Sequence, residues 1–158
     1  MGPEAYAGSM DAAAGDRAQD RRPGNDDAVV RRLLTTPGRW AVVGLTTNRR
    51  RVAPGVAAWL RDVRGLEIVP VNLSGEDVLG ERGYTRLADI PGRIDVVDCF
   101  VNSQRVGAVV DQAIEIGASA VWMQLGVVDH AAAERARAAG LDVVMDTCPK
   151  IEAPRLGL

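Results

Sequence analysis

The sequence predicts an α/β fold in which a doubly wound parallel sheet of five or six strands lies between two layers of helices. Short continuous runs rich in valine and isoleucine recur along the chain, as in strands that are covered on both faces. Segments with apolar residues at helical spacing separate these runs. Strands that alternate with helices in this way form parallel sheets through right-handed crossovers.

The folded part of the chain is expected to begin with a helix. Asn25 can cap this helix, its apolar residues recur at helical spacing over residues 29–34, and Pro37 and Gly38 end it. The strands that follow are expected at residues 40–45, 67–72, 94–100, 120–125 and 142–146. The glycine-rich connection over residues 73–93 leaves room for only a short further strand, near Tyr84.

Helices are also expected between the strands, each with a recognisable beginning and a glycine at its end. Pro54 suits the first turn of one helix, and Val63 is expected to face inward from it. Ser103 and Asp129 can cap the next helices along the chain. The expected ends are Gly65, Gly117 and Gly140.

Composition limits both the domain organisation and the classes of function. Residues 1–24 lack an apolar period and are predicted to form a flexible tail, which leaves residues 25–158 as one domain. The formal net charge of -2 provides no basic field for nucleic acid or for an anionic membrane. No apolar run approaches the roughly 20 residues that cross a bilayer, and no export signal is recognisable. With Cys99 and Cys148 as the only cysteines, a reducing cytoplasmic setting is expected.

The predicted topology also locates the functional site. In a doubly wound sheet, ligands bind beyond the carboxyl ends of the strands, where the strand order reverses. If the strand at residues 40–45 is central, this crevice lies between it and the strand at residues 94–100. The loop that starts at Gly44 is then expected to form the site together with residues 72–73, 99–103 and 124–127.

The loop after the first strand has the composition of an anion-binding site. Gly44 permits a sharp turn and a close approach of the backbone to a ligand. Short polar residues and then arginines follow it: Thr46, Thr47, Asn48, Arg49, Arg50 and Arg51. The next helix points its positive N-terminus into the same space, and guanidinium groups suit phosphate oxygens. A solvated basic loop that binds no ligand is the alternative.

Two common nucleotide-binding motifs are absent from this loop. The dinucleotide fingerprint G-x-G-x-x-G needs three glycines, whereas GLTTNR has one. The second strand ends in Asn72 instead of the acidic residue that would hold a ribose hydroxyl. The Gly-Lys-Ser/Thr ending of a P-loop is also missing. The ligand is therefore not expected to be NAD or ATP held in the standard way.

A series of motifs, taken in order, resembles the single-domain CoA-binding proteins. The motifs are VVGLTTN, IVPVN, LADIP, DVVDCF, VWMQLGVV and VVMDTCPKIEAPRLG, and the resemblance covers residues 28–158. This family has a Rossmann-like fold related to the CoA-binding N-terminal domain of the succinyl-CoA synthetase alpha subunit. The resemblance implies non-covalent binding of coenzyme A or an acyl-CoA.

The resemblance also implies which residues contact the ligand. Its phosphates and nucleotide are expected along the loop after the first strand and at the ends of the neighbouring strands. Outside that loop, the implied ligand-binding residues are Asn72, Leu73, Phe100, Val101, Gln124 and Gly126. The adenine is expected to lie against the apolar members of this set.

The sequence departs from the family pattern at three positions around the crevice. It has Arg51-Val52-Ala53 where family members commonly have Arg-Pro-Ser, and Leu73 where they have a proline. Where they have Phe-Arg-Pro, it has Phe100-Val101-Asn102, so an arginine expected at the mouth of the crevice is missing. The arginines that begin at Arg49 are candidates to replace it.

No catalytic or metal-binding constellation is recognisable. His130 is the only histidine and is expected to be a solvated residue at a helix start, and no Gly-x-Ser-x-Gly elbow is present. Asp98 is expected to cap a helix or to pair with an arginine. Cys99, at the predicted crevice, raises the hypothesis of a mixed disulfide with the thiol of CoA.

The sequence thus predicts a carrier, sensor or accessory subunit with a small-molecule CoA ligand, more than it predicts an enzyme. A protein partner or a homodimer is left open. One competing interpretation is an NAD(P)-binding redox enzyme or sensor, in which Arg49, Arg50 and Arg51 hold a ribose phosphate. The other is an interaction module that has lost its ligand, which the segment Phe100-Val101-Asn102 makes plausible.

Overall fold

The computed structural model describes residues 24–158, and the expected flexible tail lies outside this range except for Gly24. Within it, a parallel sheet has the strand order β2-β1-β3-β4-β5. The strands are β1 (Arg39–Val43), β2 (Glu67–Val71), β3 (Val96–Cys99), β4 (Ala120–Met123) and β5 (Asp142–Val144). The predicted fold class is confirmed, and β1 is an interior strand that pairs with β2 on one side and with β3 on the other.

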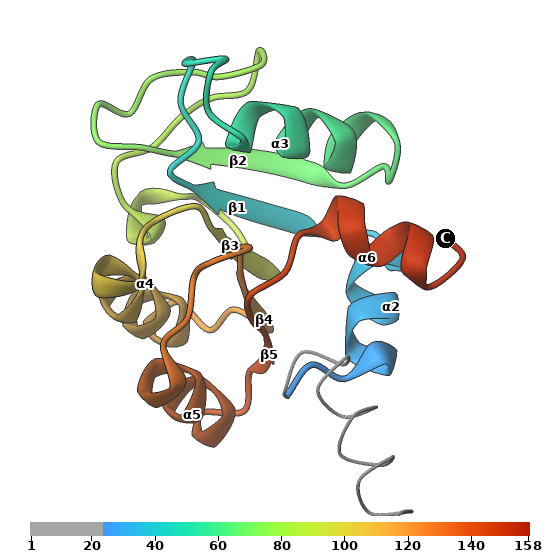
Figure 1. Cartoon of the computed structure of the whole chain (residues 1–158). Coiled ribbons are helices and arrows are strands. Elements are labelled where there is room, and N and C mark those ends of the chain that lie inside the picture. Colours follow the sequence, from blue (N-terminus) through green and yellow to red (C-terminus); the bar gives the residue numbers. More distant parts are fainter. Residues whose placement is uncertain (1–23) are drawn as a thin grey trace, which may run out of the picture.

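Helices cover both faces of the sheet and complete the three layers (Figure 1). On one face lie α2 (Asp27–Thr35), α3 (Ala53–Asp62) and α6 (Pro149–Arg155). On the other lie α4 (Ser103–Glu115), α5 (His130–Ala138) and the short 3-10 helix η1 (Leu87–Asp89). No helix in the described range is long and apolar enough to cross a membrane.

The core of the α2/α3/α6 face is built around two tryptophans. The rings of Trp40 on β1 and Trp122 on β4 lie 5.7 Å apart between centroids, and both side chains are buried. The indole N–H of Trp122 donates a 2.9 Å hydrogen bond to the backbone carbonyl of Thr147. Because a buried indole N–H needs a partner, this bond fixes the segment that leads into α6 against the sheet.

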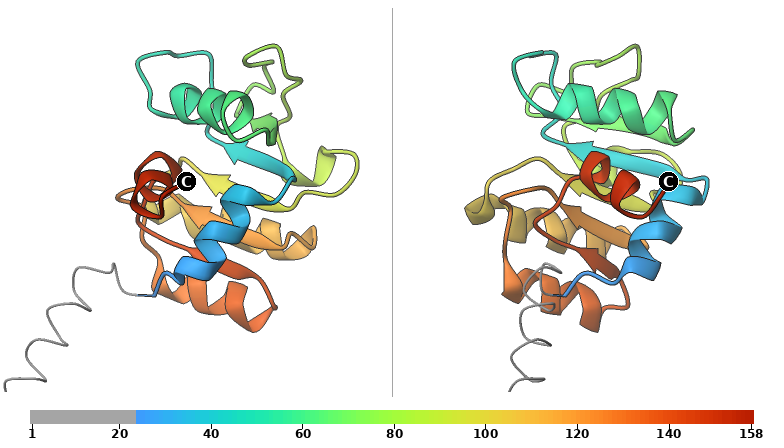
Figure 2. Two further views of the ribbon diagram at one scale, coloured as in Figure 1. Left: turned by 90° about the vertical axis from the view of Figure 1, so that its right-hand side faces the viewer. Right: turned by 45° about the vertical axis from the view of Figure 1, so that its right-hand side comes forward.

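The first and last helices of the described residues, α2 and α6, lie side by side (Figure 2). The guanidinium group of Arg155 on α6 lies 2.6 Å from a carboxylate oxygen of Asp27 on α2, and 2.6 Å from one of Glu152. Burial of Ala153 against the same core holds α6 in place. This helix was not predicted from the sequence, because it is short and contains Pro154.

Several predicted helix boundaries are corrected by one residue. Asp26, not Asn25, caps α2, and Asn102, not Ser103, caps α4. Asn25 instead bonds through its side-chain amide to both the N–H and the carbonyl of Met145, just beyond β5. The other predicted cap, Asp129 on α5, is confirmed. Val63 is wrong as an inward residue, because its side chain is 62% exposed at the end of α3.

The strands end one or two residues before their predicted ends. Residues such as Gly44 and Phe100 still donate backbone hydrogen bonds to neighbouring strands, but the chain turns there toward the helices. The short strand expected near Tyr84 is a single parallel bridge between Tyr84 and Val71. All the early strand ends fall at the carboxyl edge of the sheet, where the loops diverge and leave space.

Candidate functional site

A cavity of about 960 Å³ lies at this carboxyl edge, around the ends of β1, β2, β3 and β4. Its walls include the loop between β1 and α3, the first turn of α4, and the start of α6. The strand order reverses at β1, so the cavity occupies the switch point of the doubly wound sheet. Its size is within the range of ordinary ligand sites.

Most residues predicted for the site lie in the wall of this cavity. Those that line it are Gly44, Thr46, Asn48, Arg50, Arg51, Asn72, Leu73, Phe100, Val101 and Gln124. The predicted residues outside the wall are Thr47, Arg49 and Gly126. Thr47 is occupied elsewhere, because its N–H and hydroxyl contact the carboxylate of Glu76, and the N–H of Gly126 donates to Asp146. That the lining residues contact a ligand stays a prediction.

Gly44 is the point where three strand ends meet. Its N–H donates a 2.8 Å bond to the carbonyl of Val71 on β2, and the N–H of Phe100 donates a 2.8 Å bond to Val43. Gly44 has a φ of +94°, and a Cβ at this position would lie 2.3 Å from the carbonyl oxygen of Phe100. Only glycine fits so close to the neighbouring backbone in this conformation.

The side chain of Asn72 links the loop after β1 to the loop after β2. Its side-chain N–H groups donate to the carbonyls of Leu45 and Glu76, each at 3.0 Å. Its side-chain oxygen accepts from the N–H of Glu76 at 2.9 Å and from the hydroxyl of Ser74 at 3.3 Å. Because these bonds occupy the amide, the structure gives Asn72 a positioning role in the wall, by fixing the loop after β1.

Positive charge in the cavity comes from two elements. Arg50 and Arg51 belong to the loop after β1, and Arg105 belongs to the first turn of α4. Over residues 24–158, no ion pair joins these three arginines to a carboxylate, and no Asp or Glu lines the cavity. The N-terminus of α3 faces the same cavity without a side-chain cap. This arrangement favours an anion.

Arg105 was not among the residues predicted for the site. Side chains in a helix lean toward its N-terminus, so an arginine in the first turn of α4 reaches back to the end of β3. The sequence signal that could have identified Arg105 was an arginine in the first turn of the helix that follows Phe100-Val101-Asn102. Arg105 therefore brings a guanidinium group into the cavity, although the position immediately after Phe100 is a valine.

A buried carboxyl group lies directly behind the cavity wall. Asp98 on β3 is fully buried, and its Oδ1 accepts a 2.5 Å hydrogen bond from the side-chain amide of the cavity-lining Gln124. Its Oδ2 has no hydrogen-bond partner among the described residues. Burial raises the pKa of Asp98 to about 7, against the opposing effect of the bond from Gln124. The expectation that Asp98 caps a helix or pairs with an arginine is wrong.

Cys148, and not Cys99 as expected, is the cysteine that lines the cavity. Cys99 is fully buried on β3, does not line the cavity, and has its thiol pKa raised by burial. A mixed disulfide at Cys99 is therefore excluded without unfolding of the strand. Cys148, immediately before α6, lines the cavity instead. Burial also raises the pKa of Cys148, which makes it a weak nucleophile.

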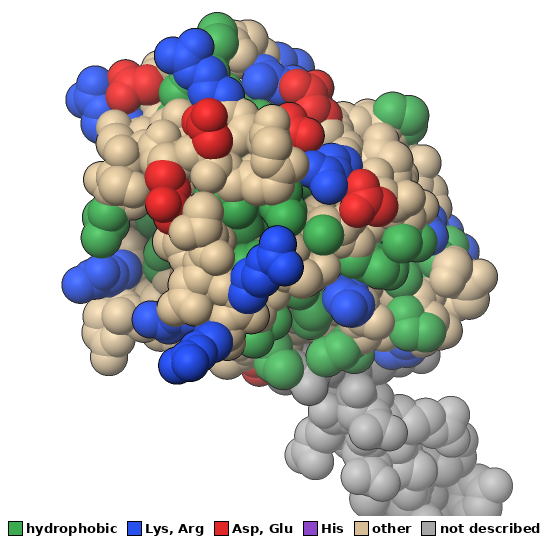
Figure 3. Space-filling view, turned by 90° about the horizontal axis from the view of Figure 1, so that it is seen from above, with side chains coloured by type: hydrophobic (Ala, Val, Ile, Leu, Met, Phe, Trp, Pro, Cys, Tyr) green, Lys and Arg blue, Asp and Glu red, His purple; other side chains and the backbone are tan. Residues whose placement is uncertain are grey.

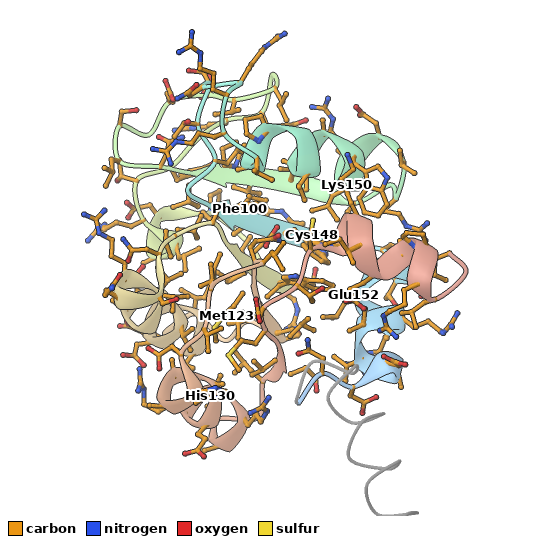
Figure 4. The ribbon with its side chains drawn as sticks, viewed as in Figure 1. Phe100, Met123, His130, Cys148, Lys150 and Glu152 are labelled. Carbon is orange, nitrogen blue, oxygen red and sulfur yellow. The ribbon has the colours of Figure 1, made fainter. Side chains whose placement is uncertain are left out.

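Among residues 24–158, no histidine, aspartate or glutamate lines the cavity. His130 is exposed at the start of α5, well apart from Phe100 and Cys148 (Figure 4), and does not line the cavity. The part of the chain from residue 24 onward contains no group of three or more His, Cys, Asp and Glu side chains that could hold a metal. Basic and acidic side chains are interspersed on the face that carries α3 (Figure 3), so that face offers no continuous basic surface to a nucleic acid.

A comparison of the sequence with protein-family models identifies the family of the chain that forms this cavity. Residues 38–154 match the family model described as a CoA binding domain. The matched region begins just before β1 and ends within α6, so it includes every wall of the cavity. The chain belongs to the CoA-binding domain family. The resemblance inferred from the sequence motifs is thereby confirmed.

The chain is also similar to other proteins over most of its length. The chain is 33% identical to the uncharacterized protein YneT of Bacillus subtilis (strain 168) over 78% of its own length and 91% of that protein. It is similar to a hypothetical protein of Pyrococcus horikoshii OT3, with a TM-score of 0.79, 36% identity and coverage of 85% and 94% of the two chains. The Thermus thermophilus protein cell-free ID.343 has a TM-score of 0.76, 28% identity and coverage of 84% and 99%.

Substitution of Gly44 by alanine is expected to destabilise the CoA-binding domain by about 3 kcal/mol or more, from backbone strain and the clash with Phe100. Gly55 is the matched control: it lies in α3, and a Cβ added there would have no atom within 4 Å, so Gly55→Ala is expected to stabilise by up to about 1 kcal/mol. Urea unfolding of both variants measures the difference. Equal stabilities for the two variants would contradict the tight contact at Gly44.

Asp98→Asn is expected to remove a pH dependence of stability. The pKa of Asp98 rises from 3.8 to about 7 on folding, so between these pH values the folded protein keeps a proton that the unfolded chain has lost. The wild-type free energy of unfolding therefore falls as pH rises from about 4 to about 7, by on the order of a few kcal/mol, and is level above that range. Asparagine cannot ionise, so its variant lacks this slope.

Urea unfolding at several pH values between 4 and 8 measures the slope. Other titrating groups are common to both proteins and cancel in the difference, and any pH-independent cost of the substitution only shifts this difference by a constant. A constant difference between wild type and Asp98→Asn across this range would show that Asp98 is ionised in the folded protein.

Proposed function

We propose that this protein binds coenzyme A or an acyl-CoA non-covalently in the cavity at the carboxyl ends of β1 and β3, and acts in the cytoplasm as a carrier, sensor or accessory subunit. The observation that carries the proposal is the set of arginines from two elements, free of ion pairs in residues 24–158, in a cavity at the switch point of a CoA-binding domain. A carrier, sensor or accessory role implies a protein that receives the ligand or the signal.

The phosphates of the ligand are assigned to the basic side of the cavity. Arg50, Arg51 and Arg105 supply guanidinium groups, and the uncapped N-terminus of α3 supplies backbone N–H groups and a favourable dipole. The loop after β1 is already held in place by Asn72 and by Glu76, so binding requires little ordering of the backbone.

The adenine is assigned to the apolar strand ends. Phe100 and Val101 follow β3, Leu73 follows β2, and all three line the cavity. The side chain of Leu73 is 95% exposed, so a ligand that covers it removes apolar surface from water. This assignment agrees with the placement expected from the sequence.

Binding without reaction is proposed because the cavity lacks the parts of a catalytic site. Its lining includes no histidine, aspartate or glutamate among the described residues, and the Cys148 thiol has a raised pKa. A nucleophile in an enzyme is normally activated by an adjacent base or by a lowered pKa.

A thermal-shift panel of CoA, acetyl-CoA, NADH, NADPH and ATP tests the ligand class. A ligand that binds only the folded state raises the melting temperature, by an amount that grows with its concentration above Kd. We expect CoA and acetyl-CoA to raise it and the other compounds to leave it unchanged. A shift by NADH or NADPH alone would identify a nicotinamide-binding protein, and no shift by any compound would identify a domain without this ligand.

Arg105→Ala is expected to weaken CoA binding by about 10- to 100-fold, the usual effect of losing a hydrogen bond to a charged group. Arg49→Ala is the matched control, because Arg49 is an exposed arginine in the loop after β1 that does not line the cavity. Calorimetry at physiological salt measures both affinities. Equal losses in the two variants would indicate a diffuse basic loop in place of a defined phosphate site.

A further inference from the structure

Exposed apolar side chains are concentrated at the cavity. In residues 24–158, five large hydrophobic side chains are exposed, and four of them line the cavity: Val52, Leu73, Leu125 and Ile151. The fifth, Val63, lies at the other end of α3. Because isolated exposed apolar residues are scattered over ordinary surfaces, their collection around one cavity indicates a surface that a ligand covers.

Part of this surface forms a distinct region, which we call the apolar lobe: Val52, Ala53, Cys148 and Ile151. It lies between the beginnings of α3 and α6, which pack on the same face of the sheet. Ala53 and Cys148 belong to the core of that face, so the lobe is continuous with the protein interior.

The base of the apolar lobe is a region of low polarity. Ala53 and Cys148 form this base, and both side chains are buried in the core of the α2/α3/α6 face. Burial is also the largest cause of the raised pKa of the Cys148 thiol. A charged ligand group is therefore disfavoured at the base of the lobe, whereas an alkyl group is accepted.

We propose that the apolar lobe is an acyl subsite, so that the ligand is an acyl-CoA with an uncharged aliphatic acyl group and its sulfur lies next to Cys148. The inference rests on the proposed function. A CoA whose phosphates lie at the arginines must extend its thiol arm along the cavity, and the lobe is the apolar wall formed by the start of α6. The acyl chain would cover Ile151 and Val52, which are 44% and 70% exposed without it.

Calorimetry with CoA, acetyl-CoA, octanoyl-CoA and succinyl-CoA tests the acyl preference. Each methylene that is fully buried strengthens binding by about fourfold. Partial burial of an octanoyl chain is therefore expected to raise the affinity by about tenfold or more over that of CoA. Succinyl-CoA, whose acyl group carries a carboxylate, is expected to gain nothing over CoA. The octanoyl-CoA to CoA affinity ratio is the readout, because it is independent of how tightly the rest of the ligand binds.

Ile151→Ser is expected to reduce this ratio by about fivefold, as one half-exposed isoleucine is lost from the subsite. Val63→Ser removes an exposed valine outside the cavity and is expected to leave the ratio unchanged. If Ile151→Ser changes the oligomeric state of the protein and not the ratio, the lobe is a protein interface and the inference is wrong.

The symmetric disulfide of CoA tests where the sulfur lies. The Cys148 thiolate would attack one sulfur of this disulfide, form a mixed disulfide, and release the second CoA as a thiolate, which takes up the proton that Cys148 lost. Because the pKa of Cys148 is raised, the exchange is run at alkaline pH. Mass spectrometry of the folded protein is expected to show one CoA adduct, retained in Cys99→Ser and lost in Cys148→Ser.

The outcomes separate this inference from the proposed function. If CoA itself does not bind, both fail. If CoA binds, but the affinity ratio stays near one and no adduct forms on Cys148, the proposed function stands and the acyl subsite is wrong. A gain in affinity for octanoyl-CoA that Ile151→Ser diminishes, together with the Cys148 adduct, supports the inference.

Discussion

The pairing of β1 with β2 on one side and β3 on the other is the constraint on which the rest of this structure depends. The chain leaves β1 for α3 on one face, and the connection after β3 leads to α4 on the opposite face. The two loops must therefore part at the carboxyl edge of the sheet, and no backbone is available to fill the space between them. The cavity is the consequence of this topology, and its lining combines the strand ends with the loop after β1 and the beginnings of α3, α4 and α6.

Close backbone contacts and side-chain hydrogen bonds fix the floor of the cavity. Gly44 lies against the carbonyl of Phe100, so the ends of β1 and β3 approach as closely as the chain allows. The side chain of Asn72 joins the loop after β2 to the loop after β1 by its bond to Leu45, and its three other hydrogen bonds fix the loop after β2. The polar groups of these loops are thus satisfied within the protein, while the arginines above them have no carboxylate partners within the described range. A preformed floor with unpaired cations suits the binding of an anionic ligand.

The ionisable side chains of β3 and the start of α6 are shielded from solvent to different extents. Asp98 and Cys99 are sealed in β3, and Cys148 faces the cavity with a pKa that keeps it protonated near neutral pH. The carboxyl group of Asp98 fixes the side chain of Gln124 from behind, so its contribution to the cavity is indirect. The apolar lobe is continuous with the buried core of the α2/α3/α6 face. A cavity with a basic side and an apolar side matches the two ends of an acyl-CoA.

The sequence by itself determined the alternation of strands and helices and the basic loop that follows Gly44. These features depend on local patterns, namely valine-rich runs, capping residues and glycines, which act over a few residues and can be recognised without the fold. The order of motifs was also sufficient to identify the CoA-binding domain family. Only the tertiary structure decided which side chains meet in the cavity.

The misplaced residues have a common physical cause. A strand buried on both faces carries no alternation that tells which of its residues points to a site, so Cys99 was chosen where Cys148 lines the cavity. Arg105 and Ile151 reach the cavity because helices bring their first turns to it, from positions far along the chain. Asn25 has the residue type of a cap, but its amide bonds with Met145, which only folding brings near. Contacts between distant segments depend on how layers pack, and no local pattern records them.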